Sequence, residues 1–167
     1  MPRHLLPAIL SCALALPAVT AAADDAMVVQ VKRLSADVAV KIAQGAVAAC
    51  RAKGIQVGAT VVDRDGTVQA VMRDTIASPL TLVISRQKAY TAANFNADTG
   101  SAGMAERANG PVGRAPGITM SAGGLPIEIG GALLGAVGVS GAPSGKTDAE
   151  CAQAGINTVK DDLEMGM

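Results

Sequence analysis

The strongest constraint on the fold is a double glycine, Gly130-Gly131, that separates two short apolar runs. Residues 125–129 and 133–139 each have the length and the aliphatic content of a strand. Two glycines accept the positive φ angles that a two-residue hairpin turn requires, so we predict an antiparallel hairpin here. Gly135 and Gly138 inside the second run predict that another backbone or a ligand approaches the sheet closely.

The remaining patterns predict helices alternating with a second hairpin. We expect a helix between Ser35 and Gly54, strands over 55–62 and 67–73, a helix over 78–95, a short helix near 102–108, and a last helix that starts with a capping box at 147–150 and runs to about 163. This order favours an α+β domain with helices on the faces of a mostly antiparallel sheet of about five strands.

Residues 1–23 are typical of a secretory leader. A basic start at Arg3 is followed by a short apolar core and then by small residues. We expect cleavage between positions 20 and 24, which leaves residues 24–167 as one domain of a periplasmic or secreted protein. A lipoprotein with a lipidated Cys12 is the alternative. No stretch is long enough to predict a membrane span.

Removal of the leader would also remove His4, which is the only histidine in the chain. Without an imidazole, the mature protein lacks the usual base of Ser–His and Cys–His nucleophile pairs, and it lacks the commonest nitrogen ligand for metals. Hydrolases with the usual catalytic triad are therefore excluded.

Charge and aromatic content narrow the partners further. The 14 basic residues balance the 14 acidic ones, so no polyanion-binding surface is indicated and nucleic acid is not an expected partner. Aromatic residues make up only 1% of the chain, with Tyr90 and Phe95 alone. A deep aromatic-lined pocket within one subunit is therefore not expected.

Two cysteines, Cys50 and Cys151, lie outside the leader and on the apolar faces of the first and last predicted helices. In an oxidising compartment they could form a disulfide that closes a long loop. They could equally be reduced core residues that act as small hydrophobes. The sequence leaves both possibilities open.

Four ordered blocks of sequence resemble a known family. They are the run at 86–92 (RQKAYTA), the run at 123–126 (GGLP), the run at 135–143 (GAVGVSGAP), and Asp148 with the run at 151–155 (CAQAG). Together they are similar to GlcG-like and HbpS-like haem-binding proteins, and to the C-terminal domain of PduO-type corrinoid adenosyltransferases. The resemblance runs from about Leu34 to Val159.

The resemblance implies a profilin-like α/β/α sandwich that assembles into homo-oligomers and binds haem outside the cytoplasm. It also implies that Thr91 lies at the haem site. Some relatives use a histidine of the first helix as an axial ligand, and the first predicted helix of this chain contains no histidine.

The residues themselves suggest which side chains could bind such a ligand. Lys88, Thr91 and Phe95 share one helical face, on which they could hold a propionate, approach the iron and stack on the macrocycle. Alternatively, Lys88 covers the sheet edge, Thr91 caps a carbonyl and Phe95 is core. Tyr90 lies off this stripe, but a tyrosine oxygen can ligate ferric haem iron.

Other candidates are cationic or rich in glycine. Arg73, Arg86 and Arg114 could each hold a carboxylate, although each alone could also be a solvated surface charge. Gly123-Gly124 could expose N–H groups to an anion or form only a bulge.

We therefore expect an extracytoplasmic protein that binds haem or another tetrapyrrole at an oligomer interface, as a scavenger, buffer or sensor accessory, with little or no catalysis of its own. The propionates would lie on Lys88 and nearby arginines, with Thr91 or Tyr90 near the iron. The alternatives are an accessory protein for small hydroxy acids or corrinoids, and a purely structural oligomer whose exposed hairpin edge mediates assembly.

Overall fold

The computed structural model describes residues 27–166, so the predicted leader at 1–23 lies outside the described residues. Residues 31–166 belong to one compact unit, and residues 27–30 belong to a separate one. Within the described chain, no helix combines the length and the apolar character needed to cross a membrane.

Both predicted hairpins form, and they join into one antiparallel sheet. The strands are β1 (Gly58–Asp63), β2 (Val68–Arg73), β3 (Gly124–Ile129) and β4 (Ala132–Ser140), in the order β2-β1-β4-β3. The described sheet has four strands rather than the expected five, because each of the two hairpins contributes one pair and β1 pairs with β4 between them.

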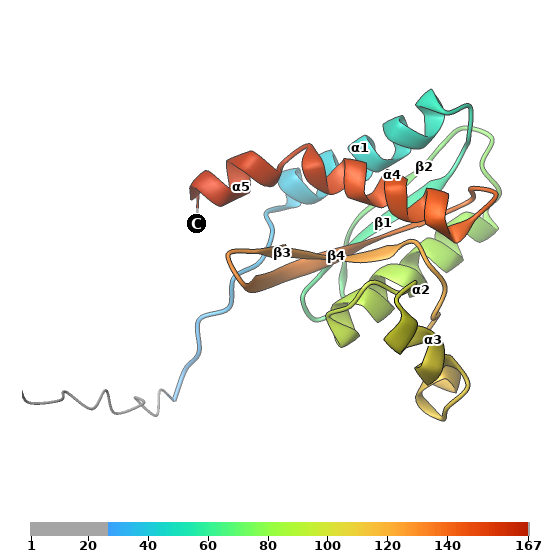
Figure 1. Cartoon of the computed structure of the whole chain (residues 1–167). Helices are drawn as coiled ribbons and strands as arrows, with labels where there is room; N and C mark the ends of the chain where they lie inside the picture. The colour runs from blue at the N-terminus through green and yellow to red at the C-terminus, as the bar shows by residue number, and fades with distance from the viewer. Residues whose placement is uncertain (1–26, 167) are drawn as a thin grey trace, which may run out of the picture. The chain divides into compact units, whose positions relative to one another are not determined.

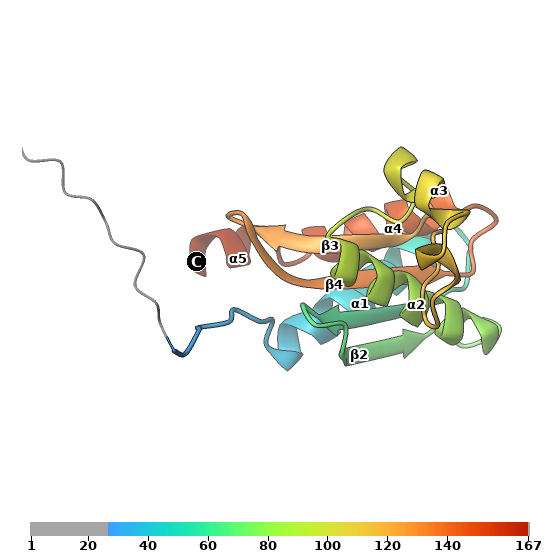
Figure 2. The same ribbon diagram turned by 90° about the horizontal axis from the view of Figure 1, so that it is seen from below.

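Helices cover both faces of this sheet, which confirms the α/β/α arrangement. Figure 1 shows α1 and α4 side by side over one face and α2 on the other, and Figure 2 shows the same layers after a quarter turn. The helices are α1 (Ala36–Ala52), α2 (Leu80–Phe95), α3 (Ala102–Ala108), α4 (Gly145–Asn157) and α5 (Lys160–Gly166), with a 3₁₀ turn η1 (Val112–Arg114).

The glycines of the second hairpin have the roles that the sequence predicts. Gly130 and Gly131 adopt φ angles of 57° and 78°, and Ile129 pairs with Ala132 across them as a two-residue loop. At Gly138 a Cβ atom would lie 2.0 Å from the carbonyl oxygen of Ser85 in α2. The helix can therefore pack on β4 only because this position has no side chain.

The predicted start of the last helix is wrong by a few residues. The N-cap of α4 is Ser144, whose hydroxyl accepts a hydrogen bond from the backbone N–H of Thr147 at 3.1 Å. Thr147 thus lies inside the helix, and Asp148 is buried rather than a capping residue. The helix also does not run unbroken to Leu163, since α4 ends at Asn157 and α5 begins at Lys160.

A disulfide joins Cys50 of α1 to Cys151 of α4, with their Cα atoms 5.5 Å apart. Of the two possibilities that the sequence leaves open, the structure thus contains the disulfide. Both cysteines have no exposed surface and belong to the main core, which lies between the sheet and these two helices.

A β-bulge at Gln69 in the edge strand β2 changes the face on which the following side chains lie. Val71 pairs with Thr60 and Val68 pairs with Val62, while Gln69 has no partner in the register. Thr60 bonds to α2 through Ser85, so Val68 and Val71 both face the α2 side although they are three positions apart. Two apolar side chains of β2 are thereby turned to the same face.

Candidate functional site

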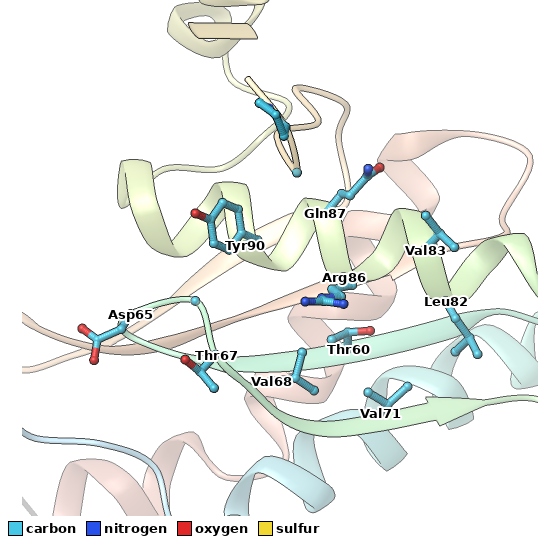
Figure 3. A pocket seen from close by; sticks show the side chains of 13 residues that line it. Thr60, Asp65, Thr67, Val68, Val71, Leu82, Val83, Arg86, Gln87 and Tyr90 are labelled. Carbon is cyan, nitrogen blue, oxygen red and sulfur yellow. The ribbon is translucent and has the colours of Figure 1, made fainter. Parts of the chain in front are cut away.

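A cavity of about 1030 Å³ lies between α2 and the β1–β2 hairpin (Figure 3). Its lining residues come from three segments. They are Thr60, Asp65, Gly66, Thr67, Val68 and Val71 of the hairpin, Leu82, Val83, Arg86, Gln87 and Tyr90 of α2, and Pro116 and Gly117 of the long connection before β3. Ligand pockets commonly have volumes of about 300–1,000 Å³, so this cavity can hold a large organic molecule.

The cavity exists because α2 leaves part of the sheet uncovered. The small residues Ala89, Ala92 and Ala136 let α2 pack tightly near Val62 in the middle of the sheet. The edge strand β2 extends beyond the helix, so Val68 and Val71 remain 37% and 52% exposed. The result is a groove with an apolar floor beside the outer side of α2.

Two glycines flank the edges of the Tyr90 ring, Gly66 closely and Gly117 with room for a methyl group. A Cβ atom on Gly66 would lie 2.6 Å from Cδ2 of Tyr90, and one on Gly117 would lie 3.8 Å from Cδ1. Both glycines have a φ angle of +85°, which disfavours any other residue there. The phenol hydroxyl makes no hydrogen bond with residues 27–166, so it is available to a ligand.

Arg86 provides the unpaired positive charge of the cavity. The other charged lining residue, Asp65, already forms an ion pair with Arg33. Arg86 is exposed and has no ion-pair partner within the described part of the chain. Figure 3 shows its guanidinium extending from α2 across from Val68 and Thr60. An acidic group on a ligand would therefore find its counter-charge at Arg86.

Lys88, predicted to hold a propionate, has a different partner. Its Nζ atom lies 2.8 Å from a carboxylate oxygen of Asp148 and 3.0 Å from the carbonyl oxygen of Val139. The Lys88 side chain is only 3% exposed. Burial raises the pKa of Asp148, and hydrogen bonds from Lys88 and from the N–H of Ala142 oppose this shift. Lys88 thus belongs to the interior rather than to the cavity.

Thr91 is also buried, with no exposed surface. Its hydroxyl donates a hydrogen bond to the carbonyl of Gln87 at 2.7 Å and accepts one from the N–H of Thr119 at 2.9 Å. This matches the alternative in which Thr91 caps a carbonyl. Phe95 is half-buried beside Arg107, whose guanidinium lies 5.6 Å from the ring centre. The predicted stripe therefore does not present one common surface.

The remaining candidates lie outside the cavity lining. Gly123 and Gly124 pack against Lys88, because a Cβ atom on Gly123 would lie 2.8 Å from its Nζ atom. Arg73, at the end of β2, donates to the carbonyl of Ala77. Arg114 is exposed on η1. Of the predicted site residues, the structure brings only Arg86 and Tyr90 together in the cavity.

Sequence reasoning missed the apolar floor and the loop wall. The sequence predicts Val68 and Val71 only as parts of the strand over 67–73, because the bulge that turns both to one face has no clear local signal. Gly117 lies in the connection between the short helix near 102–108 and the second hairpin, where no pattern predicts a functional role. The pair Pro116-Gly117 could have indicated a turn, but not that this turn lies beside Tyr90.

The described residues hold no cluster of three or more histidine, cysteine, aspartate or glutamate side chains that could bind a bare metal ion. Among the cavity-lining residues, Tyr90 alone has a side chain of a type that ordinarily ligates haem iron. The apolar floor and the guanidinium of Arg86 favour an organic ligand with an acidic group.

Three solved structures are similar to this chain. HbpS from Streptomyces reticuli, as a double mutant, is 34% identical, with a TM-score of 0.75 over 86% of this chain and 98% of that one. Protein ORFY of Klebsiella pneumoniae is 24% identical, with a TM-score of 0.71 over 79% and 94%. The PduOC–haem complex is 23% identical, with a TM-score of 0.67 over 75% and 94%. The last two show the fold alone.

Among curated proteins, none matches this chain. A family model described as haem-degrading protein HbpS-like does match it, over residues 34–157. This range agrees with the extent of the resemblance in the sequence, and it includes every residue that lines the cavity. The chain therefore belongs to the HbpS-like family.

Proposed function

We propose that this protein binds haem, or a closely related tetrapyrrole, in the cavity between α2 and the β1–β2 hairpin. The observation that carries the proposal is the combination of an apolar floor, an unpaired arginine and a tyrosine hydroxyl in one cavity of about 1030 Å³. Two comparisons support it, since the family model is described as haem-degrading and a structural relative is a haem complex.

The lining residues fit the chemistry of a porphyrin acid. Val68, Val71 and Leu82 offer apolar contact to a flat macrocycle and exclude water from it. Arg86 can bind both oxygens of a propionate. Tyr90 can donate its phenol oxygen to ferric iron, as tyrosine does in catalase-type sites.

Haem would supply the iron chemistry, while the protein would supply a complementary site from which haem can dissociate. An oxygen ligand and one surface cation hold ferric haem less firmly than a pair of histidines would, so release remains possible. We therefore propose a scavenger, buffer or sensor accessory. The basic, apolar start of the chain supports a periplasmic or secreted location for it.

We also propose that the protein forms homo-oligomers. Ile76 in the connection before α2, and Leu80 and Val83 in the first turns of α2, are 80%, 60% and 54% exposed. Exposed apolar patches of this kind commonly mark protein–protein contacts. The guanidinium of Arg73 lies beside Ile76 and donates a hydrogen bond to the carbonyl of Ala77, so the three apolar side chains themselves would form the contact between two copies.

Titration of the purified chain with hemin tests the binding proposal. We expect a saturable change in the Soret band, weakened about tenfold or more in Arg86→Gln, because a hydrogen bond to a charged group contributes about 1.5–3 kcal/mol. Tyr90→Phe should change the spectrum of the bound haem. Arg64→Gln, which removes an arginine from the exposed β1–β2 turn, is the matched control. A flat titration of the wild-type chain would remove the proposal.

A thermal-shift panel separates the competing classes, because only a ligand that binds the folded chain raises its melting temperature. Hemin should raise it, whereas cobalamin and glycolate should not. A shift with glycolate alone would favour the small-acid alternative, in which Arg86 holds the carboxylate.

A further inference from the structure

We infer that Thr119 is a positioning residue, which holds the wall segment 116–117 against Tyr90 and thereby fixes the phenol ring at the cavity. The inference rests on the proposed haem site only for its effect on the ligand. Its effect on Tyr90 itself follows from the protein alone.

Thr119 is tied to one turn of α2 by two hydrogen bonds. Its backbone N–H donates to the hydroxyl of Thr91 at 2.9 Å, and its hydroxyl donates to the side-chain oxygen of Gln87 at 2.9 Å. Thr91 closes the network by donating to the backbone carbonyl of Gln87 at 2.7 Å. Backbone and side chain of one residue thus dock the segment on the helix.

The other hydrogen bonds of this segment are made on either side of Thr119. On one side, the N–H of Ile118 closes a local turn onto the carbonyl of Ala115. On the other side, the hydroxyl of Thr99 donates to the carbonyl of Ser121 at 2.7 Å. Between these two points, Thr119 provides the described hydrogen bonds that connect the segment to α2.

The segment that Thr119 docks forms one side of the Tyr90 clamp. Gly117 lies along the Cδ1 and Cε1 edge of the ring, and Gly66 lies along the opposite edge. The Gly66 side belongs to the β1–β2 turn, which is held by hydrogen bonds to the Asp63 carboxylate. Loss of the Thr119 contacts would therefore let the wall move away from the Gly117 edge of the ring, while the closer Gly66 edge stays in place.

Tyr90 offers a direct readout, because the chain contains one tyrosine and no tryptophan. The tyrosine band of the near-UV circular dichroism spectrum reports how firmly that single ring is held. We expect Thr119→Val, which keeps the shape and the N–H bond to Thr91 but removes the hydroxyl bond to Gln87, to weaken this band without ligand present. Thr119→Ser, which restores the hydroxyl, should recover it.

The same variants should alter haem exchange. We expect Thr119→Val to release hemin to an acceptor apoprotein about fivefold faster than wild type, since the one hydrogen bond that it removes contributes about 1 kcal/mol. Thr119→Ser should release it at the wild-type rate. Thr147→Val, which removes a hydrogen-bonded hydroxyl from α4, is the matched control for both measurements.

The outcomes distinguish this inference from the proposed function. If Thr119→Val keeps the full tyrosine band, or if Thr119→Ser is as impaired as Thr119→Val, the positioning role is overturned. If the tyrosine band responds as expected but the wild-type chain ignores hemin, the positioning role stands and the haem proposal fails.

Discussion

The ammonium of Lys88 and the carboxylate of Asp148 form an ion pair at 2.8 Å that joins α2 to α4, helices on opposite faces of the sheet. Both side chains are almost completely buried, at 3% and 5% exposure. Such a pair loses the hydration of two charges, so its value to the fold depends on both partners being present.

We predict that Lys88→Met lowers the free energy of unfolding by about 3–5 kcal/mol, because it leaves the buried carboxylate uncompensated. Combining it with Asp148→Leu should cost less than the two single changes added together. Chemical denaturation measures all three variants. Lys53→Met is the matched control, since the Lys53–Glu150 pair has side chains 44% and 48% exposed and should contribute little. Equal losses at the two lysines would contradict the prediction.

The contributions of two aspartates to stability should change in opposite directions as the pH falls. Two hydrogen bonds from Arg51 lower the pKa of Asp74, so its contribution is present above the unfolded value of about 3.9 and is lost as the pH falls through the lowered pKa. Burial raises the pKa of Asp148, so its contribution is present below about 3.9 and is lost as the pH rises through the raised pKa.

The stability deficit of Asp74→Asn relative to wild type should therefore shrink on acidification, whereas that of Asp148→Asn should grow. Unfolding free energies measured from neutral pH to about pH 3 check both slopes. Parallel curves for the two variants would sink the prediction.

The disulfide should stabilise the fold strongly without affecting the cavity. Cys50 and Cys151 are 101 positions apart, and closing a loop of that length is worth roughly 4–5 kcal/mol in the chain-entropy model. The double replacement Cys50→Ala with Cys151→Ala should lower the unfolding free energy by about that amount. Hemin affinity should not change, because the bridge joins α1 to α4 and the cavity lies on the α2 side.

Mass spectrometry gives the preliminary check on the bridge. Oxidised chain should gain about two daltons when it is reduced after unfolding. The folded chain should resist a mild reductant, since neither Cys50 nor Cys151 has any exposed surface. Absence of the mass change would remove the disulfide.

Two glycine replacements test the clamp on Tyr90 as a matched pair. Gly66→Ala and Gly117→Ala both place an alanine at a φ angle of +85°, at a cost of about 1–2 kcal/mol each. Only the new methyl group at position 66 collides with the ring, at 2.6 Å rather than 3.8 Å. We expect the two variants to have similar melting temperatures. Only Gly66→Ala should show a weakened tyrosine band. A band that is unchanged in both variants would show that Gly66 does not restrain the ring.

The apolar patch at the start of α2 gives the test for self-association. Leu80→Asp should convert the chain to monomers in sedimentation experiments, because it places a charge in the proposed contact. An aspartate also suits the first turn of a helix, so the fold should tolerate it. Val40→Asp, on the exposed side of α1, is the control and should leave the assembly unchanged. A wild-type chain that is already monomeric at all concentrations would refute the proposed oligomer.

Much of the fold could be predicted because its signals are local. The Gly130-Gly131 turn, the Ser35 cap and the short helix near 102–108 each depend on residues a few positions apart. The start of α4 was misplaced because Ser144 and Thr147 both precede suitable helical residues. Which of the two caps the helix depends in part on Asp148. Its carboxylate accepts a hydrogen bond from Lys88, 60 positions away in the chain.

The candidate site could be predicted only in part, for the same reason. Helical spacing correctly groups Lys88 with Thr91, but it does not say which side of α2 faces the sheet. The alanines that pack on Val62 and the glycine at 138 turn that face inward, which buries both residues. Arg86 and Tyr90, one turn apart on the outer side, are left to line the cavity.

By itself, the sequence determined the hairpins, most helix limits, the family and the absence of histidine after position 4, because these follow from residue types and short spacings. Only the tertiary structure decided the buried ion pair, the bulge that turns Val68 and Val71 to one face of β2, and the placement of Gly66 and Gly117 beside Tyr90. Each of these joins segments far apart in the chain, and their contacts depend on how tightly the layers pack rather than on any local preference.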